Sequence, residues 1–151
     1  MTAMPRLVLL TTAFLSALVL TACGGTLTGP SVAPGTPAAS LAIETNTVWH
    51  LRSMTDAGGA LQVIEDPSLF TLTLTDGGKI AARIDCNRAS GGYTISGNAL
   101  SIGPLASTKA YCGAASFDST FLRLLGGETT GTASGSTLQL SSPRGILTFE
   151  R

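Results

Sequence analysis

The stretch "LFTLTLTDGGKIAARI", residues 69–84, contains the clearest strand pattern in the chain. In its first half apolar residues alternate with threonines, and this alternation is typical of a half-buried β-strand. "DGG" at 76–78 can supply the positive φ angles that a tight hairpin requires. The second half then places Ile80, Ala82 and Ile84 on one side of a return strand. The stretch therefore predicts an antiparallel hairpin with one buried face.

Period-two patterns continue on both sides of this hairpin. "NTVWHLRS" at 46–53 places Trp49 and Leu51 on one face, and "ALQVI" at 60–64 predicts a short second strand. A further hairpin is predicted around "SGNA" at 96–99, and a closing hairpin around "SSPR" at 141–144. Together these segments predict about seven or eight strands.

One segment, "ASFDSTFLRLLGG" at 115–127, has the period of a helix instead. Its apolar residues follow Phe117 at the i+4, i+7 and i+8 positions, which form one face of a helix. Ser116 is expected as the N-cap and Gly126 as the stop. We therefore predict an α+β fold: a single small β-rich domain with a curved antiparallel sheet and one packed helix. Periodicity does not say whether such a sheet closes into a barrel.

The N-terminal segment has the features of a lipoprotein signal. The apolar run at 7–20 is too short to span a bilayer comfortably, and "LTAC" at its end resembles a bacterial lipobox. We predict a signal peptide at 1–22, lipidation at Cys23, a flexible linker over 23–40 and a folded domain over 41–151. A membrane-spanning anchor and a plain secretory signal are the alternatives.

The residue after the lipobox cysteine bears on location. Gly24 follows Cys23 where an aspartate would argue for inner-membrane retention. We therefore expect a lipid-anchored protein of the cell envelope, on the outer membrane and facing the periplasm. Its anchor is the N-terminal lipid, which includes palmitate, and we expect the protein to be a monomer.

The remaining cysteines are Cys86 and Cys112. An even pair in an exported domain predicts a disulfide, because that compartment is oxidising. Such a bridge closes a loop of about 27 residues, for which the chain-entropy model gives roughly 3–4 kcal/mol. Two free thiols are the alternative.

Composition argues against several classes of function. Arg6 is the only charged residue before position 40, so the rest of the chain has eight cations and nine acids, with no basic stripe for nucleic acid. His50 is the single histidine, and one histidine with two cysteines falls short of a zinc site. No nucleotide-binding or metalloprotease motif is present. We expect no enzymatic activity, no metal and no cofactor.

The stretch "RIDCNRASGGY" at 83–93 is the strongest candidate for an active site. A nucleophilic Cys86 would need a base nearby, and no histidine is close to it in sequence. A structural corner between two hairpins is the better interpretation, with Asn87 in a turn or left-handed conformation. Asp85, Asn87 and Arg88 are predicted to face a partner.

Taken in order, several motifs resemble the META domain family, which includes the heat-shock lipoprotein HslJ. The similarity runs through "DGGKIAARIDCNRASGGYTISGNALSIGPLASTKAYC" and "FDSTFLRLL" to the final "LQL" and "ILTFER", and covers 44–151. Trp49 and Leu51 match the family's Trp-x-Leu, and Cys86 is followed by its asparagine. Thr108 and Cys112 match the later threonine and cysteine, here separated by "KAY".

The resemblance implies a small exported α+β domain linked to stress response and novobiocin tolerance, without established catalytic residues. We therefore expect a non-enzymatic stress-response or envelope-maintenance role, with an unknown protein or lipid as partner. Two alternatives remain. One is a binding module that holds a lipid or lipoprotein segment in a cleft of the sheet, and the other is an inhibitor of an envelope-attacking hydrolase.

Overall fold

The computed structural model describes residues 40–151. The predicted signal peptide, the lipidation site Cys23 and the linker up to residue 39 lie outside the described residues. Within the described part, no helix is both long and apolar enough to cross a membrane.

Strands dominate the described domain, which contains ten of them, one α-helix and one short 3-10 helix. The elements are β1 (Val48–Asp56), β2 (Leu61–Val63), η1 (Pro67–Leu69), β3 (Phe70–Thr75), β4 (Lys79–Ile84), β5 (Asn87–Ser96), β6 (Ala99–Ile102), β7 (Ala106–Ser107), α1 (Asp118–Leu125), β8 (Gly127–Ser134), β9 (Thr137–Ser142) and β10 (Gly145–Glu150).

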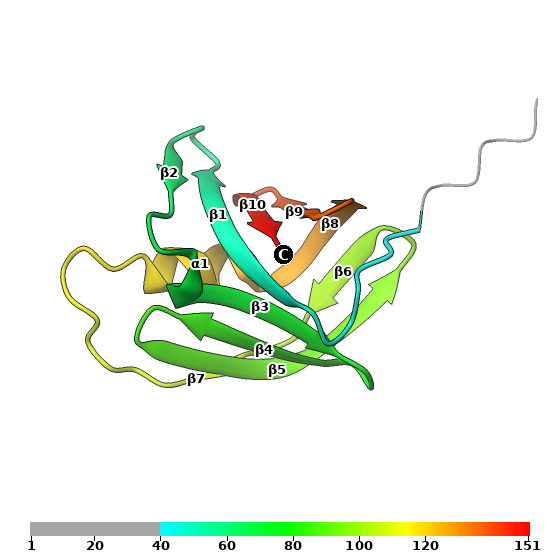
Figure 1. Cartoon of the computed structure of the whole chain (residues 1–151), viewed down its shortest axis with the longest axis horizontal. Helices are drawn as coiled ribbons and strands as arrows, with labels where there is room; N and C mark the ends of the chain where they lie inside the picture. Colours follow the sequence, from blue (N-terminus) through cyan, green and yellow to red (C-terminus); the bar gives the residue numbers. More distant parts are fainter. Residues whose placement is uncertain (1–39) are drawn as a thin grey trace, which may run out of the picture. The chain divides into compact units, whose positions relative to one another are not determined.

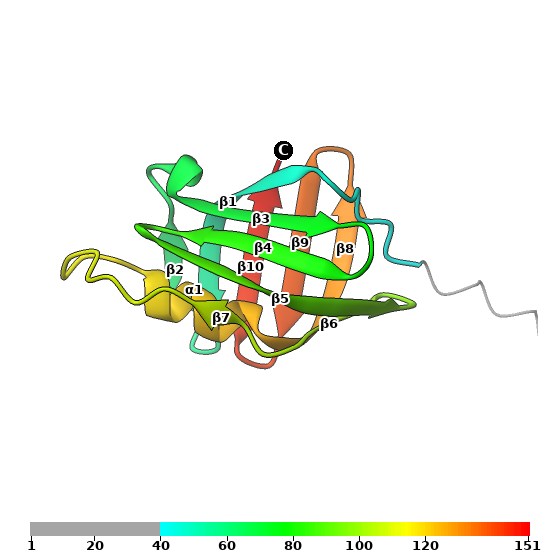
Figure 2. The same cartoon turned by 90° about the horizontal axis from the view of Figure 1, so that it is seen from below.

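The sheet closes into a barrel, which corrects the expected curved sheet. Neighbouring strands follow the order β10-β9-β8-β6-β5-β4-β3-β1, and β1 pairs in turn with β10, so eight antiparallel strands form a ring. The short strands β2 and β7 pair only with β1 and β5. Figures 1 and 2 show β3, β4 and β5 side by side, crossing the layer of β1, β10, β9 and β8. The prediction of a small β-rich domain with one helix is confirmed.

Closure depends on β1, which pairs with β2, β3 and β10. Its first residues, Val48–His50, pair with β3, while nearly its whole length pairs with β10. Arg52 is an extra residue in the β1–β10 register, and such a bulge bends a strand and increases its twist. No periodicity in the sequence encodes this bend, because alternation specifies the faces of a strand and not its partners.

Side chains pack the interior of the barrel. Alternate residues of the strands are buried, as β3 and β4 show with their strictly alternating burial. The largest fully buried side chains are Trp49, Phe121, Phe149, Leu51, Met54, Leu72, Leu74, Ile80, Ile84, Leu100, Leu124 and Leu125. Each fully buried apolar side chain of this size contributes roughly 1.5–3 kcal/mol. Small barrels are commonly filled in this way, and here the filling is the hydrophobic core.

The helix α1 contributes its apolar face to that core. Phe121 stacks edge-on against Phe70 and Phe149, with ring centroids 5.7 and 6.2 Å apart. The helix begins one residue later than predicted: Phe117 is the N-cap, and the Ser116 hydroxyl accepts a hydrogen bond of 3.3 Å from the Asp118 N–H. The predicted stop is correct, since the residue after Leu125 is the C-cap.

Candidate functional site

The stretch 83–93 forms one turn and one long strand. β4 and β5 are joined by the two-residue turn Asp85–Cys86, and Asp85 has a φ of 59°. Asn87 is the first residue of β5, so the expectation that Asn87 takes the turn conformation is wrong. The left-handed residue is the aspartate, whose N–H donates to the Leu69 carbonyl at 2.7 Å.

Asn87 is buried and is the centre of a partly buried hydrogen-bond network. Its Oδ1 accepts from the Thr108 hydroxyl at 2.9 Å and from the Ala110 N–H at 2.8 Å. Its Nδ2 donates to the Ala110 carbonyl at 3.0 Å and to Asp118 Oδ2 at 3.3 Å. The side-chain amide therefore fixes the segment that precedes α1 against the start of β5.

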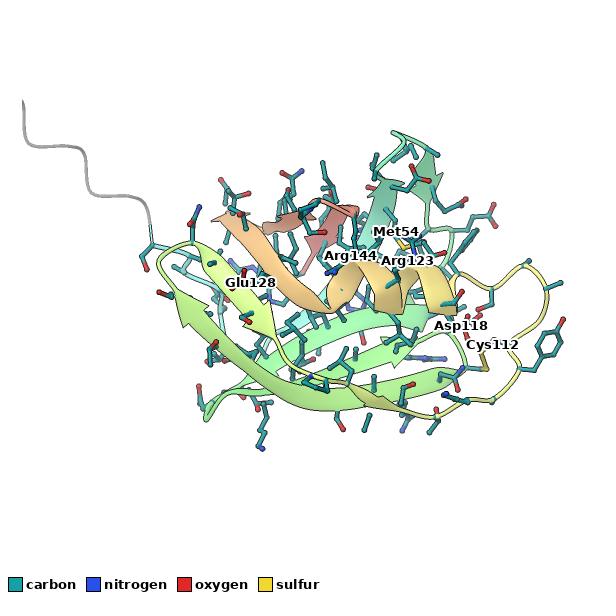
Figure 3. All side chains as sticks on the ribbon, turned by 180° about the vertical axis from the view of Figure 1, so that it is seen from behind. Met54, Cys112, Asp118, Arg123, Glu128 and Arg144 are labelled. Carbon is teal, nitrogen blue, oxygen red and sulfur yellow. A yellow bond between two sulfur atoms is a disulfide. The ribbon has the colours of Figure 1, made fainter. Side chains whose placement is uncertain are left out.

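Two more links hold the same segment. The Thr108 hydroxyl accepts from the Arg88 N–H at 3.0 Å, and the Thr108 N–H donates to the Arg88 carbonyl at 3.0 Å. Cys86 and Cys112 form a disulfide with a Cα–Cα distance of 5.5 Å. Figure 3 shows Cys112 beside Asp118 near the start of α1. We call Cys86, Asn87, Thr108, Cys112 and Asp118 the corner cluster.

The three residues predicted to face a partner have different environments. Asn87 is only 3% exposed, and the corner cluster uses its hydrogen-bonding groups, so the prediction that it faces a partner is wrong. Asp85 is half-buried, and its carbonyl accepts a hydrogen bond of 3.1 Å from Arg83 Nε. Arg88 is exposed.

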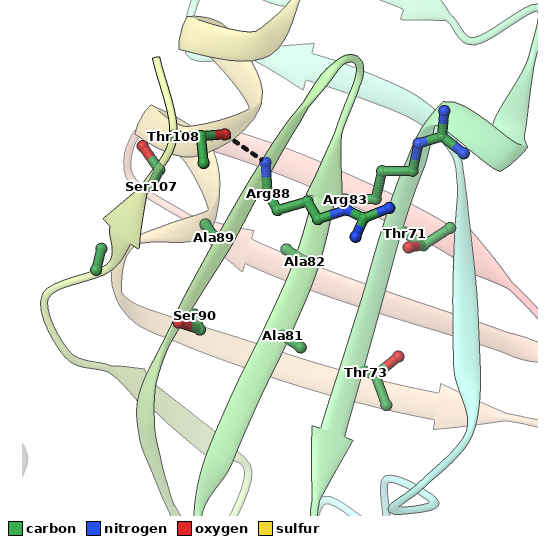
Figure 4. Close-up of a pocket in the computed structure, with 11 residues that line it drawn as sticks. Thr71, Thr73, Ala81, Ala82, Arg83, Arg88, Ala89, Ser90, Ser107 and Thr108 are labelled. Carbon is green, nitrogen blue, oxygen red and sulfur yellow. Dashed lines mark hydrogen bonds between the residues drawn. The ribbon is translucent and has the colours of Figure 1, made fainter. Parts of the chain in front are cut away.

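A hollow of about 670 Å³ lies on the outside of the barrel, next to the corner cluster. We call it the outer groove. Its floor is formed by β3, β4 and β5, and residues 106–108 form one wall. Figure 4 shows the side chains of this floor and the Arg88 side chain reaching across β4 toward Arg83 and Thr71. The groove is open to the surface, and most side chains on its floor are small.

Glycine at position 91 lets the wall approach the floor. A Cβ on Gly91 would lie 2.8 Å from the Pro104 carbonyl oxygen and 2.9 Å from Leu105 Cδ2. The chain can therefore cross β5 closely just before β7, whose residues pair with Ala89 and Ser90. Together with the corner cluster, this close crossing fixes the wall at both ends.

A second hollow, of about 390 Å³, lies between β2, η1 and the residues before α1. Its rim carries three carboxylates, Glu65, Asp66 and Asp85. The side-chain hydrogen bond from Ser68 is the main cause that lowers the pKa of Asp66, and nearby Arg83 lowers it further. The two hollows thus differ in charge, with acids around this one and cations on the outer groove.

The side chains considered for catalysis, His50 and Cys86, do not form a catalytic arrangement in the described residues. His50 faces outward on β1, with its Nδ1 3.3 Å from the Pro67 carbonyl, and Cys86 is occupied by the disulfide. Within 40–151, no three His, Cys, Asp or Glu side chains lie close enough together to hold a metal ion.

Sequence reasoning missed the outer groove and the role of Thr108. A signal for the groove was present, since the outward positions of β4 and β5 are occupied by cations and small residues, such as Arg83 and Ser90, without any acid. The part played by Thr108 had no such signal, because it depends on a contact across twenty residues with Asn87 and Arg88.

The fold and corner cluster define a small antiparallel barrel with one helix and a disulfide-braced corner. The family model of the META domain matches residues 40–151, and the chain therefore belongs to the META domain family. The motif residues Asn87, Thr108 and the two cysteines of the domain, which carried the resemblance, meet in the corner cluster.

The solved structures that are similar to this chain have low sequence identity to it. An NMR structure of a protein from Burkholderia xenovorans has 22% identity and a TM-score of 0.59, covering 79% of this chain and 98% of that one. A second NMR structure has 21% identity and a TM-score of 0.52, covering 68% of this chain and 86% of the other. A crystal structure of a lipocalin-like protein from Bacteroides uniformis has 18% identity and a TM-score of 0.48, covering 77% and 99%. A search of curated proteins finds no match.

Proposed function

We propose that this protein is a lipid-anchored, non-enzymatic binding module of the cell envelope that holds its ligand in the outer groove. The observation that carries the proposal is the groove itself, about 670 Å³ in volume and built on strands of a rigid barrel. Ligand pockets for small molecules typically have volumes of about 300–1,000 Å³. The corner cluster holds one wall in place, so the ligand does not have to order it on binding.

The position of the groove changes the binding-module hypothesis. A lipid tail held inside the sheet would need an interior space, but Leu51, Leu72 and Phe149 are among the side chains that fill the barrel, each fully buried. In this proposal the ligand lies on the outer face of β3, β4 and β5, against side chains such as Thr71, Arg83 and Ser90.

The non-enzymatic character is supported by the state of the reactive side chains. A thiolate nucleophile requires a free cysteine, and the disulfide occupies both cysteines of the folded domain. His50, the single histidine, has its Nδ1 3.3 Å from the Pro67 carbonyl and makes no hydrogen bond to an acid or a nucleophile within residues 40–151. The stress-related role comes from the family resemblance.

The envelope location is supported by the lipobox and tested by labelling. Palmitate added to growing cells should mark the wild-type protein and should not mark a Cys23→Ala variant. An unlabelled wild type, or a labelled variant, would remove the lipid anchor from the proposal.

The groove is tested by photo-crosslinking in the native host. A photoreactive amino acid replaces Ser90 on the groove floor, and in a matched control it replaces Gln139, an exposed strand residue of β9 on the opposite side of the ring. The mass of any adduct then identifies the class of the ligand. We expect adducts at Ser90 and none at Gln139, whereas equal yields at the two positions would contradict a ligand site in the groove.

A second candidate, an inhibitor of an envelope-attacking hydrolase, is favoured by one loop. Tyr111 is 85% exposed and lies next to the disulfide, in a segment that Asn87 holds by hydrogen bonds to Ala110. Rigid, exposed aromatic side chains are efficient anchors in protein interfaces. Inhibition of a lysozyme or an envelope protease at micromolar concentration, lost in Tyr111→Ala, would support this function, and no inhibition across such a panel would remove it.

A further inference from the structure

Positive charge is concentrated on one face of a nearly neutral domain. The outward positions of β3, β4 and β5 carry Lys79, Arg83 and Arg88 but no carboxylate. The acids nearest in sequence, Asp76 and Asp85, lie in the turns at the two ends of β4. The outer groove therefore has a cationic floor, although the part of the chain after residue 39 has one acid more than it has cations.

Two of these cations are cross-strand neighbours. Arg83 on β4 pairs directly with Arg88 on β5, in the register next to the two-residue turn. Like charges placed directly opposite on an antiparallel pair repel each other and destabilise the sheet. The arrangement is therefore unfavourable for the isolated domain, and an anion between the two side chains would relieve it.

Both guanidinium groups have unused donors. Arg83 donates from Nε to the Asp85 carbonyl, and within the described residues neither its terminal nitrogens nor the Arg88 guanidinium makes a hydrogen bond. The ion pairs in that part of the chain are formed by Arg52 with Glu150 and by Arg151 with Glu44, so neither groove arginine has a carboxylate within salt-bridge distance.

A hydroxyl group lies next to the pair. Thr71 on β3 is the cross-strand neighbour of Arg83, whereas Ser107 on the groove wall pairs with Ala89. Small neighbours, Ala81 and Ser90, leave room for a ligand to approach the strands. A group with several acceptor oxygens can therefore accept hydrogen bonds from the two arginines and from the Thr71 hydroxyl.

We propose that the Arg83–Arg88 end of the outer groove binds a phosphate group, an inference that rests on the proposed function and names the ligand chemistry of the same groove. Arginine matches phosphate because its planar fork donates two parallel hydrogen bonds to a pair of oxygens. A phosphate has enough oxygens to accept from both arginines at once, and its negative charge compensates two adjacent cations. A single carboxylate has only two oxygens to share between them.

One neighbouring acid opposes this binding. Arg83 is among the causes that lower the pKa of Asp66, after the hydrogen bonds from Ser68, so this carboxylate is ionised and lies within electrostatic range of the site. Asp66→Asn should therefore strengthen phosphate binding. This variant tests the site in the direction opposite to the arginine variants.

The decisive experiment follows the Nε–Hε NMR signals of the arginines in the whole protein, kept in neutral detergent. The probes are inorganic phosphate and sn-glycerol 3-phosphate. We expect saturable shifts of the Arg83 and Arg88 signals, and a loss of affinity of about tenfold or more in Arg83→Gln and in Arg88→Gln. Arg123→Gln is the matched control, because Arg123 is exposed on α1 and lies outside the groove lining (Figure 3).

An experiment with vesicles shows whether the phosphate group belongs to a lipid headgroup or to a soluble ligand. Phosphatidylcholine vesicles with and without phosphatidylglycerol are compared by co-sedimentation with a Cys23→Ser variant, so that the protein's own lipid does not contribute. Arginine-dependent binding that requires phosphatidylglycerol indicates a lipid headgroup. Arginine-dependent binding of glycerol phosphate without preference for these vesicles indicates a soluble phosphorylated ligand.

The proposal is overturned if the soluble probes do not shift the Arg83 and Arg88 signals and co-sedimentation with vesicles does not depend on these arginines. It is also overturned if Arg123→Gln weakens binding as much as the groove variants do. The crosslinking experiment distinguishes a failure of phosphate binding from a failure of the groove as a ligand site. Adducts at Ser90 that are unchanged in Arg88→Gln would leave the groove as a ligand site and remove the phosphate.

Discussion

Replacing Asn87 with alanine removes the side chain that joins the barrel to the segment before α1. Three of its hydrogen bonds are 3.0 Å or shorter, and a fourth reaches Asp118 at 3.3 Å. Each such bond contributes about 1 kcal/mol net, and the bond to a charged group somewhat more. The variant also leaves the partly buried Ala110 N–H without its acceptor. The disulfide still holds the segment close, which lets water replace part of the network, so we expect a loss of about 2–4 kcal/mol.

Urea denaturation and thermal melting measure this loss. For a domain of this size the expected decrease in Tm is about 10–20 °C. The control is Asn98→Ala, because Asn98 is an exposed asparagine in the turn between β5 and β6 and should change stability by no more than about 0.5 kcal/mol. A loss below about 1 kcal/mol for Asn87→Ala, or an equal loss for both variants, would refute the structural role of the corner cluster.

Three other perturbations test separate parts of the domain. The double variant Cys86→Ser/Cys112→Ser should lose about 3 kcal/mol in urea, since the bridge closes a sequence separation of 26 residues. Unchanged stability, or free thiols found by alkylation of non-reduced wild type, would argue against the bridge. Gly145→Ala should lose more than about 2 kcal/mol, because Gly145 has a φ of 145° and a Cβ would collide with the Thr55 carbonyl of β1. Gly135→Ala, which has open space around it, should lose only about 1–2 kcal/mol for its left-handed backbone, and an equal loss for the two would contradict the close β1–β10 contact. The side-chain hydrogen bond from Thr45 is the main cause that lowers the pKa of Asp76, and the bond from Asn46 lowers it further. The ionised carboxylate therefore stabilises the fold at a pH above its unfolded pKa. This contribution is lost as the pH falls through the folded pKa. The stability of Asp76→Asn should therefore fall less steeply than that of the wild type between about pH 5 and pH 2, and parallel curves would exclude this contribution.

The strands and the helix were predictable because burial imposes a period on the sequence. Alternation around residues 69–84 identified β3 and β4 with their buried faces, and the i, i+4, i+7 spacing identified α1. Closure was not predictable. It depends on β1 meeting both β3 and β10 across a bulge at Arg52, and side-chain alternation carries no information on which strands become partners.

The candidate site was predictable only in its covalent part. The cysteine count indicated the pair at 86 and 112, since the exported context favours disulfides. The burial of Asn87 was misjudged because asparagine most often occupies turns, whereas here its amide replaces backbone partners for a segment more than twenty residues away. The structure gives the turn conformation to Asp85 instead.

Substitutions on the two faces of β3, β4 and β5 should have different effects. Their inward residues form the packed core of the barrel, so changes there alter stability first. Their outward residues, including Thr71, Arg83 and Ser90, line the floor of the groove. If the groove binds a ligand as we propose, substitutions at these positions should change ligand preference while the corner cluster keeps the wall fixed. By the same reasoning, a variant such as Arg88→Gln should change binding and leave the unfolding free energy nearly as it was, because relief of the repulsion with Arg83 offsets the lost contacts.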